Sequence, residues 1–156
     1  MWAPVVFEHV TCMREGLTMT ALRSVVVMLA LIAATSSAIA GSAKVVLQLT
    51  DGTLDKHSLV LAVAENLLAH YGDEIELEIV AFGPGLPMLF ADADNAARVD
   101  GLAARGVRFA ACRNTHKKLT KVLGKEPLLS RSAREVEAGA ARIIELVNEG
   151  YVLLRP

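Results

Sequence analysis

From residue 44 onward, short apolar runs alternate with segments that carry apolar residues at helical spacing. The apolar runs predict five strands, at residues 44–49, 75–82 and 107–111, near Val136, and at 151–154. Strands that alternate with helices in this way are typical of parallel sheets covered by helices. The pattern therefore predicts an α/β fold, a three-layer α/β/α sandwich around a mostly parallel five-stranded sheet.

Five helical segments are expected between and after these strands. The first ends at Gly72, a short one begins at Pro87 after a Gly83-Pro84-Gly85 turn, and the others are 92–105, a helix to Leu123 capped by Asn114 or Thr115, and 139–150. The side chains expected to face the core are Leu59, Val60, Val63, Ala64, Leu67, Leu68 and Tyr71, then Ala96, Val99, Leu102 and Ala103, then Leu119, Val122 and Leu123, and finally Ala140, Ile143, Ile144 and Val147.

The segment before the last helix allows two interpretations. Ser132-Ala133-Arg134-Glu135 matches the capping box that begins a helix, whereas Glu135-Val136-Glu137 has the alternation of a short strand. We favour the strand, with Gly139 opening the last helix.

The first 40 residues have the features of a secretory signal. A run of ten apolar residues, 25–34, follows Arg23, and Ala38-Ile39-Ala40 resembles a small-residue cleavage site. We expect residues 1–40 to be a signal peptide and 41–156 to be a single periplasmic or secreted domain without stable membrane insertion after cleavage. Met13 and Met19 are alternative starts, and a start at Met19 makes residues 1–18 a mis-assigned leader. An uncleaved membrane anchor is the other interpretation of the same run.

Composition and charge exclude several function classes. The chain has 16 basic and 17 acidic residues, for a net charge of −1, and its one tryptophan, Trp2, lies in the leader. A nucleic-acid partner is therefore not expected. Asp51, Asp55 and His57 lie close in sequence but do not match a known metal-ligand spacing, and no metal or cofactor is expected.

Cys112 is the candidate reactive residue. It is the one cysteine after residue 40, it follows a predicted strand, and it precedes a helix N-terminus, where free amides and the helix dipole favour a thiolate. Arg113 and His116 add positive charge nearby. Two alternatives remain, a packed cysteine that acts as a small hydrophobe and a His116 that is an ordinary surface histidine.

Three segments resemble the DsrE/DsrF-like family of small sulfur-metabolism proteins. They are Ile79-Val80-Ala81-Phe82-Gly83-Pro84-Gly85, then Gly106-Val107-Arg108-Phe109-Ala110-Ala111-Cys112-Arg113-Asn114-Thr115, and last Glu149-Gly150-Tyr151 with Arg155-Pro156. The resemblance implies a five-stranded parallel sheet, homo- or hetero-oligomers, and a cysteine that carries sulfur.

Together these features give a functional hypothesis with one alternative. Cys112 is expected to hold sulfane sulfur as a persulfide, as a carrier or sulfurtransferase between donor and acceptor proteins. Arg113 and the amides near Asn114 and Thr115 are expected to stabilise the anion, and His116 to tune it. The alternative is a non-catalytic oligomeric module of the cell envelope that binds a small anion or assembles with partners.

Overall fold

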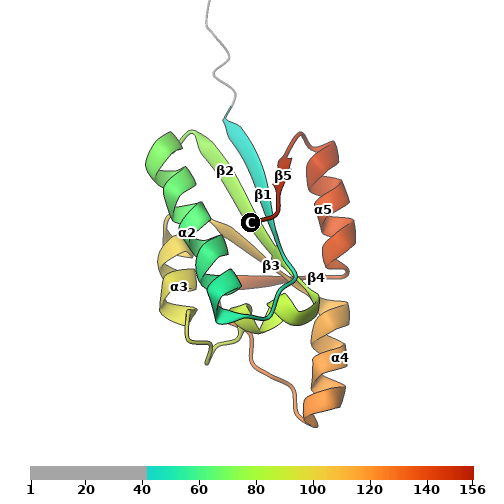
Figure 1. Ribbon diagram of the computed structural model, residues 1–156. Coiled ribbons are helices and arrows are strands. Elements are labelled where there is room, and N and C mark those ends of the chain that lie inside the picture. The colour runs from blue at the N-terminus through green and yellow to red at the C-terminus, as the bar shows by residue number, and fades with distance from the viewer. Residues whose placement is uncertain (1–41) are drawn as a thin grey trace, which may run out of the picture. The chain divides into compact units, whose positions relative to one another are not determined.

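The sheet contains five parallel strands in the order β4-β3-β2-β1-β5 (Figure 1). The strands are β1 (Ala43–Leu49), β2 (Ile75–Ala81), β3 (Arg108–Cys112), β4 (Ala133–Val136) and β5 (Val152–Leu154). This computed structural model describes residues 42–156, and the expected signal peptide lies outside the described residues. The predicted parallel sheet is confirmed, and so is the strand rather than a helix near Val136.

Helices cover both faces of the sheet, as a three-layer sandwich requires. On one side lie α2 (Leu54–Tyr71) and α3 (Ala96–Ala104), on the other lies α5 (Gly139–Asn148), and α4 (Arg113–Leu123) projects beyond the end of β3 (Figure 1). The 3-10 helix η1 (Gly83–Leu89) follows β2. No helix in the 42–156 region is long and apolar enough to cross a membrane.

Each face of the sheet has its own hydrophobic core. Side chains alternate along a strand, so Ala110 of β3 faces α5 while its neighbours Phe109 and Ala111 face the α2 and α3 side. The core beneath α5 is the smaller one and contains Val46, Val80, Ala110, Ile143, Leu146 and Tyr151. The position of Cys112, two residues after Ala110, directs its side chain to the α5 side.

Several predicted helix boundaries were wrong. The short helix predicted from Pro87 is η1, which begins at Gly83 and includes the predicted turn, because Pro84 fits its first turn. The predicted helix 92–105 is shorter, because α3 begins only at Ala96. At α2 the Thr53 hydroxyl caps the helix and accepts a hydrogen bond from the Lys56 amide at 3.4 Å.

Part of the predicted core was also wrong. In α2, Leu59 and Tyr71 are exposed and Leu61 is fully buried, because the continuous apolar run from Leu59 to Ala64 does not specify which stripe faces the sheet. In α5, Leu146 is buried in place of the predicted Ile144 and Val147. In α4, Val122 and Leu123 are exposed, because the C-terminal half of the helix lies beyond the sheet (Figure 1).

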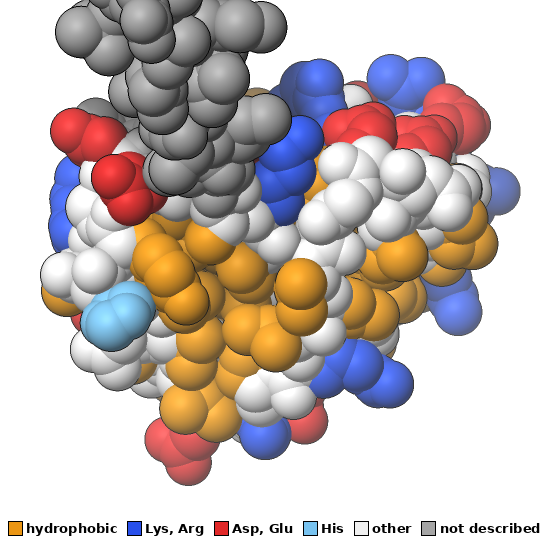
Figure 2. Space-filling model, turned by 90° about the horizontal axis from the view of Figure 1, so that it is seen from above, with side chains coloured by type: hydrophobic (Ala, Val, Ile, Leu, Met, Phe, Trp, Pro, Cys, Tyr) orange, Lys and Arg blue, Asp and Glu red, His pale blue; other side chains and the backbone are white. Residues whose placement is uncertain are grey.

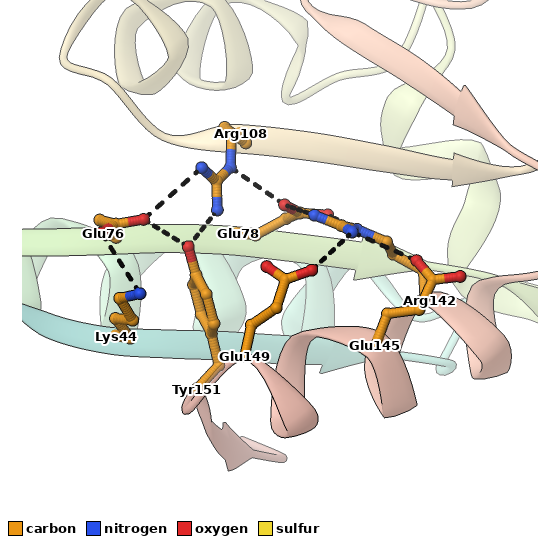
Figure 3. A network of polar contacts seen from close by, with 8 residues as sticks. All are labelled: Lys44, Glu76, Glu78, Arg108, Arg142, Glu145, Glu149 and Tyr151. Atoms are coloured by element: carbon orange, nitrogen blue, oxygen red, sulfur yellow. Dashed lines mark hydrogen bonds and ion pairs between the residues drawn. The ribbon is translucent and has the colours of Figure 1, made fainter.

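Glu76 and Glu78, the acidic residues of β2, belong to an ion-pair network that was not predicted (Figure 3). Glu78 is only 1% exposed, and Arg142 of α5 donates to its two carboxylate oxygens at 2.8 and 3.0 Å. Arg108 of β3 donates to the same carboxylate at 3.0 Å. Burial raises the pKa of Glu78, but the hydrogen bond and charge of Arg142 outweigh it, so the net shift lowers the pKa and Glu78 stays ionised.

We predict that Arg142→Met lowers the free energy of unfolding by about 3–5 kcal/mol, because it leaves a buried carboxylate with only one, half-exposed partner. The double variant Glu78→Met/Arg142→Met should recover most of that loss, since it removes both buried charges. Urea unfolding of the two variants and the parent measures the effect. Equal losses in the single and double variants would show that the ion pair is not the cause.

Candidate functional site

Cys112 ends β3 and is the N-cap residue of α4. Cys112 is 5% exposed, and its backbone pairs with Val136 of the neighbouring edge strand β4. The free amides of α4 therefore begin directly after the sulfur-bearing residue. The N-terminus of α5, at Gly139, lies on the same side of the sheet. Two helix N-termini thus meet at one sulfur atom.

Four neutral groups lower the pKa of the Cys112 thiol. They are the Thr115 hydroxyl and the backbone amides of Gly139, Thr115 and Asn114. Burial raises the pKa of the Cys112 thiol, but these hydrogen bonds outweigh the burial effect and lower the pKa below its ordinary value. The site stabilises a thiolate mainly with neutral dipoles.

The Thr115 hydroxyl is oriented by the loop after β2. The Gly83 amide donates to Thr115 Oγ1 at 3.0 Å, which occupies an acceptor position on that oxygen. The hydroxyl proton is then available for the Cys112 sulfur. Gly83 has a φ of 57°, a left-handed conformation that suits glycine, so the η1 loop contributes to the site through its backbone.

Gly139 is required by the close approach of α5 to Phe82. A Cβ atom at residue 139 would lie 2.8 Å from Phe82 Cδ1 and 3.0 Å from its Cβ. Only a glycine therefore allows the first turn of α5 to come this close to the end of β2. The same turn carries the amide that faces Cys112.

Asn114 and Thr115, two of the predicted supporting residues, lie at the start of α4. The prediction that Asn114 or Thr115 caps the helix was wrong, because α4 already begins at Arg113 and both residues lie within its first turn. Both contribute backbone amides to the sulfur site, and Thr115 adds its side chain. This dual use of Thr115 has no local sequence signal, since it depends on the Gly83 loop.

Arg113 forms ion pairs with Glu135 in the edge strand β4 and with Glu137 just after it. Its Nη1 lies 3.0 Å from Glu137 Oε2, and its Nε lies 3.4 Å from Glu135 Oε2. The contacts of the guanidinium are thus ion pairs to β4 and the residue after it.

His116 is a buried histidine, so the surface-histidine alternative was wrong. Its Nδ1 lies 2.9 Å from Glu135 Oε1, and its Nε2 lies 2.8 Å from the Pro127 carbonyl oxygen. Burial lowers the pKa of His116, but the Pro127 and Glu135 hydrogen bonds outweigh it and raise the pKa overall. An imidazolium satisfies both acceptors at once, and it joins α4 to β4 and to the preceding loop.

The three residues weighed for metal binding do not form a cluster. His57 is buried, and its Nε2 lies 3.1 Å from the Asp51 carbonyl oxygen, while the Asp51 carboxylate accepts from Thr53. In the part of the chain that the structure describes, no group of three or more His, Cys, Asp or Glu side chains is placed to hold a metal ion.

We predict that Gly139→Ala raises the pKa of Cys112, because the added methyl group moves the α5 amide away from the sulfur. Overpacking against Phe82 should also cost about 1–3 kcal/mol of stability. Gly101→Ala is the matched control, since its Cβ would meet nothing within 4 Å in α3. The pH dependence of iodoacetamide alkylation at Cys112 measures the shift, and an unchanged profile in Gly139→Ala would exclude a role for this amide.

We also predict that His116 makes stability depend on pH. Because its folded pKa is raised, its contribution is fully present below the ordinary histidine pKa of about 6.5 and is lost as the pH rises through the folded value. Denaturant unfolding between about pH 5 and about pH 8, the range in which histidines titrate, should show this loss in the parent. This loss of stability with rising pH should be absent in His116→Gln and retained in His70→Gln, an exposed control in α2. A loss of the same size in His116→Gln would contradict the assignment.

Comparison with known proteins supports the fold. No protein-family model matches the chain, and no curated protein matches it either. Among solved structures, the chain is similar to MTH1491 of Methanobacterium thermoautotrophicum, described as a protein of unknown function. The two share 26% sequence identity with a TM-score of 0.65, and the match covers 73% of this chain and 99% of that one. The chain is therefore an α/β protein of this parallel-sheet architecture.

Proposed function

We propose that this protein carries sulfane sulfur as a persulfide on Cys112 and passes it to an acceptor. The observation that carries the proposal is the place of Cys112, buried at the end of β3 as the N-cap residue of α4, where the Thr115 hydroxyl and the amides of Asn114, Thr115 and Gly139 lower the pKa of its thiol. Such donors stabilise the thiolate, which is the nucleophilic form of cysteine. The resemblance of residues 79–85 and 106–115 to the DsrE/DsrF-like family supports the same chemistry.

Sulfur loading on Cys112 needs no external oxidant. The thiolate attacks the outer sulfur of a persulfide R–S–SH, the new bond joins Sγ to that sulfur, and the old S–S bond breaks. The electron pair of the broken bond leaves with RS⁻, so the charge moves from Cys112 to the leaving thiolate, and the proton stays on the transferred sulfur. Delivery reverses these steps with an acceptor thiolate. The donors around Sγ also lower the pKa of Cys112 as a leaving thiol, which favours delivery.

The low exposure of Cys112 determines which donors can reach it. At 5% exposure the sulfur admits a small or extended reagent, such as a hydropolysulfide or the tip of a persulfide-bearing side chain. Burial also protects the thiol from oxidation in the export compartment that residues 1–40 suggest, periplasmic or secreted. Donor and acceptor proteins are the proposed partners, and the sulfur is cargo, so no cofactor is invoked.

The alternative, a non-catalytic assembly or anion-binding module, is favoured by one specific observation. Large hydrophobic side chains on α5 and the edge strand β5 are exposed, namely Ile144, Val147, Val152, Leu153 and Leu154. Figure 2 shows hydrophobic side chains gathered over much of the end of the molecule seen there. Exposed apolar side chains of this kind are typical of protein interfaces, and they also support the homo-oligomer that we propose.

We predict that polysulfide treatment of the purified protein adds sulfur to Cys112 and that a reductant removes it. Peptide mass mapping measures the gain and separates Cys112 from Cys12. Cys112→Ser should lose the gain at this peptide and keep its circular dichroism spectrum, because serine preserves size and hydrogen bonding. A folded parent whose Cys112 stays unmodified would favour the non-catalytic module.

A further inference from the structure

Helix α4 presents a basic outer side. Its sequence contains four basic residues, Arg113, Lys117, Lys118 and Lys121, and no acidic one. The three lysines are exposed, and Lys125 follows just after the helix. Within residues 42–156, none of these four lysines forms an ion pair with a carboxylate. Positive charge is thus concentrated on α4 of a chain whose net charge is −1.

Exposed apolar side chains adjoin these lysines at the projecting end of α4. Val122 is 73% exposed, Leu123 51%, and Leu128 in the following loop 77%. Leu123 continues the inward stripe of His116, Leu119 and Thr120, but by this point the helix has passed the edge of the sheet (Figure 1). The apolar stripe of α4 therefore extends beyond the core that buries its first half.

A cleft lies along the same helix. It has a volume of about 560 Å³, and Lys117 and Lys121 line it together with Arg113, His116, Thr120, Glu126 and Glu135. The surface of α4 thus offers a concave site with basic side chains, next to an apolar tip.

We propose that Lys117, Lys118 and Lys121, with Val122, Leu123 and Leu128, form a docking surface for an acidic segment of another protein that also contributes an apolar side chain. Carboxylates complement the unpaired lysines, and the apolar side chain covers the leucines. We call these six residues the α4 surface.

Charge and composition favour this occupant over two others. A symmetric contact between two copies would bring two lysine-rich α4 helices together, which like-charge repulsion disfavours. A membrane-surface helix commonly carries Trp or Phe on its apolar face, whereas residues 113–130 contain no aromatic residue other than His116. The docking of an acidic segment does not require the proposed function. That the docked protein is a sulfur donor or acceptor does rest on that function, since α4 begins directly after Cys112.

The test uses the full chain and two labelled helical peptides of equal length and equal glutamate content, one with leucines on one face and one with alanines instead. Fluorescence anisotropy at low salt measures binding. The leucine peptide should bind roughly tenfold more tightly than the alanine peptide, and Leu128→Ser should remove that advantage. Lys117→Glu/Lys121→Glu should weaken binding of both peptides by roughly tenfold or more. Arg105→Glu/Arg155→Glu, at two exposed positions outside α4, makes the same change in net charge as the double lysine variant, so it is the matched charge control and should leave binding unchanged.

Three results would overturn the proposal. Equal binding of the two peptides would show only a general attraction for polyanions, and equal loss in Arg105→Glu/Arg155→Glu would show that net charge is the cause. Tighter binding to phosphatidylglycerol vesicles than to the leucine peptide, lost in Lys117→Glu/Lys121→Glu, would make the α4 surface a membrane site. Cys112→Ser should bind the leucine peptide normally, and Lys117→Glu/Lys121→Glu should still load sulfur from polysulfide. A failure of docking is therefore distinguishable from a failure of sulfur carriage.

Discussion

The convergence of two helix N-termini on one strand-end sulfur is the constraint on which the site depends. In a parallel sheet every strand ends at the same edge, and the helix that follows begins there with unpaired amides. Cys112 uses the amides of its own following helix, α4, and that of Gly139 in α5, which follows the neighbouring strand β4. The right-handed parallel connections of the fold therefore build an anion site from backbone groups that would otherwise need water.

The ion pair beneath α5 supports this geometry. Arg142 lies three residues after Gly139, and it joins α5 to the buried Glu78 of β2, which Arg108 joins to β3. At the other end of the first turn, Phe82 and Gly139 set how closely the helix approaches. One salt bridge and one glycine thus fix α5 against the sheet at both ends of the turn that carries the sulfur-facing amide. We infer that the buried charge is retained because it fixes the position of the helix, at a cost in desolvation.

The sequence was sufficient for the fold and for one residue of the site. Alternating apolar runs and helical segments predict a parallel sheet, because both periods are local properties of the chain, and strand-end placement identifies Cys112. The supporting residues depend on distant contacts that no local pattern encodes. Thr115 accepts a hydrogen bond from Gly83 in another loop, and Gly139 packs against Phe82. His116 forms hydrogen bonds with Glu135 and with the Pro127 carbonyl. The buried ion pair of Glu78 has no local signal for the same reason, since the arginine that pairs with it comes from a helix 64 residues later.

The most direct test of the account is the thiolate titration of Cys112, followed by ultraviolet absorbance in a Cys12→Ser background so that one thiol reports. The account predicts a midpoint below that of an unperturbed cysteine in the parent. It also predicts the same midpoint in Thr115→Ser, which keeps the hydroxyl, and a higher one in Thr115→Val, which removes it. A parent midpoint at or above the ordinary value would contradict the central claim that the two helix N-termini and Thr115 hold Cys112 as a thiolate.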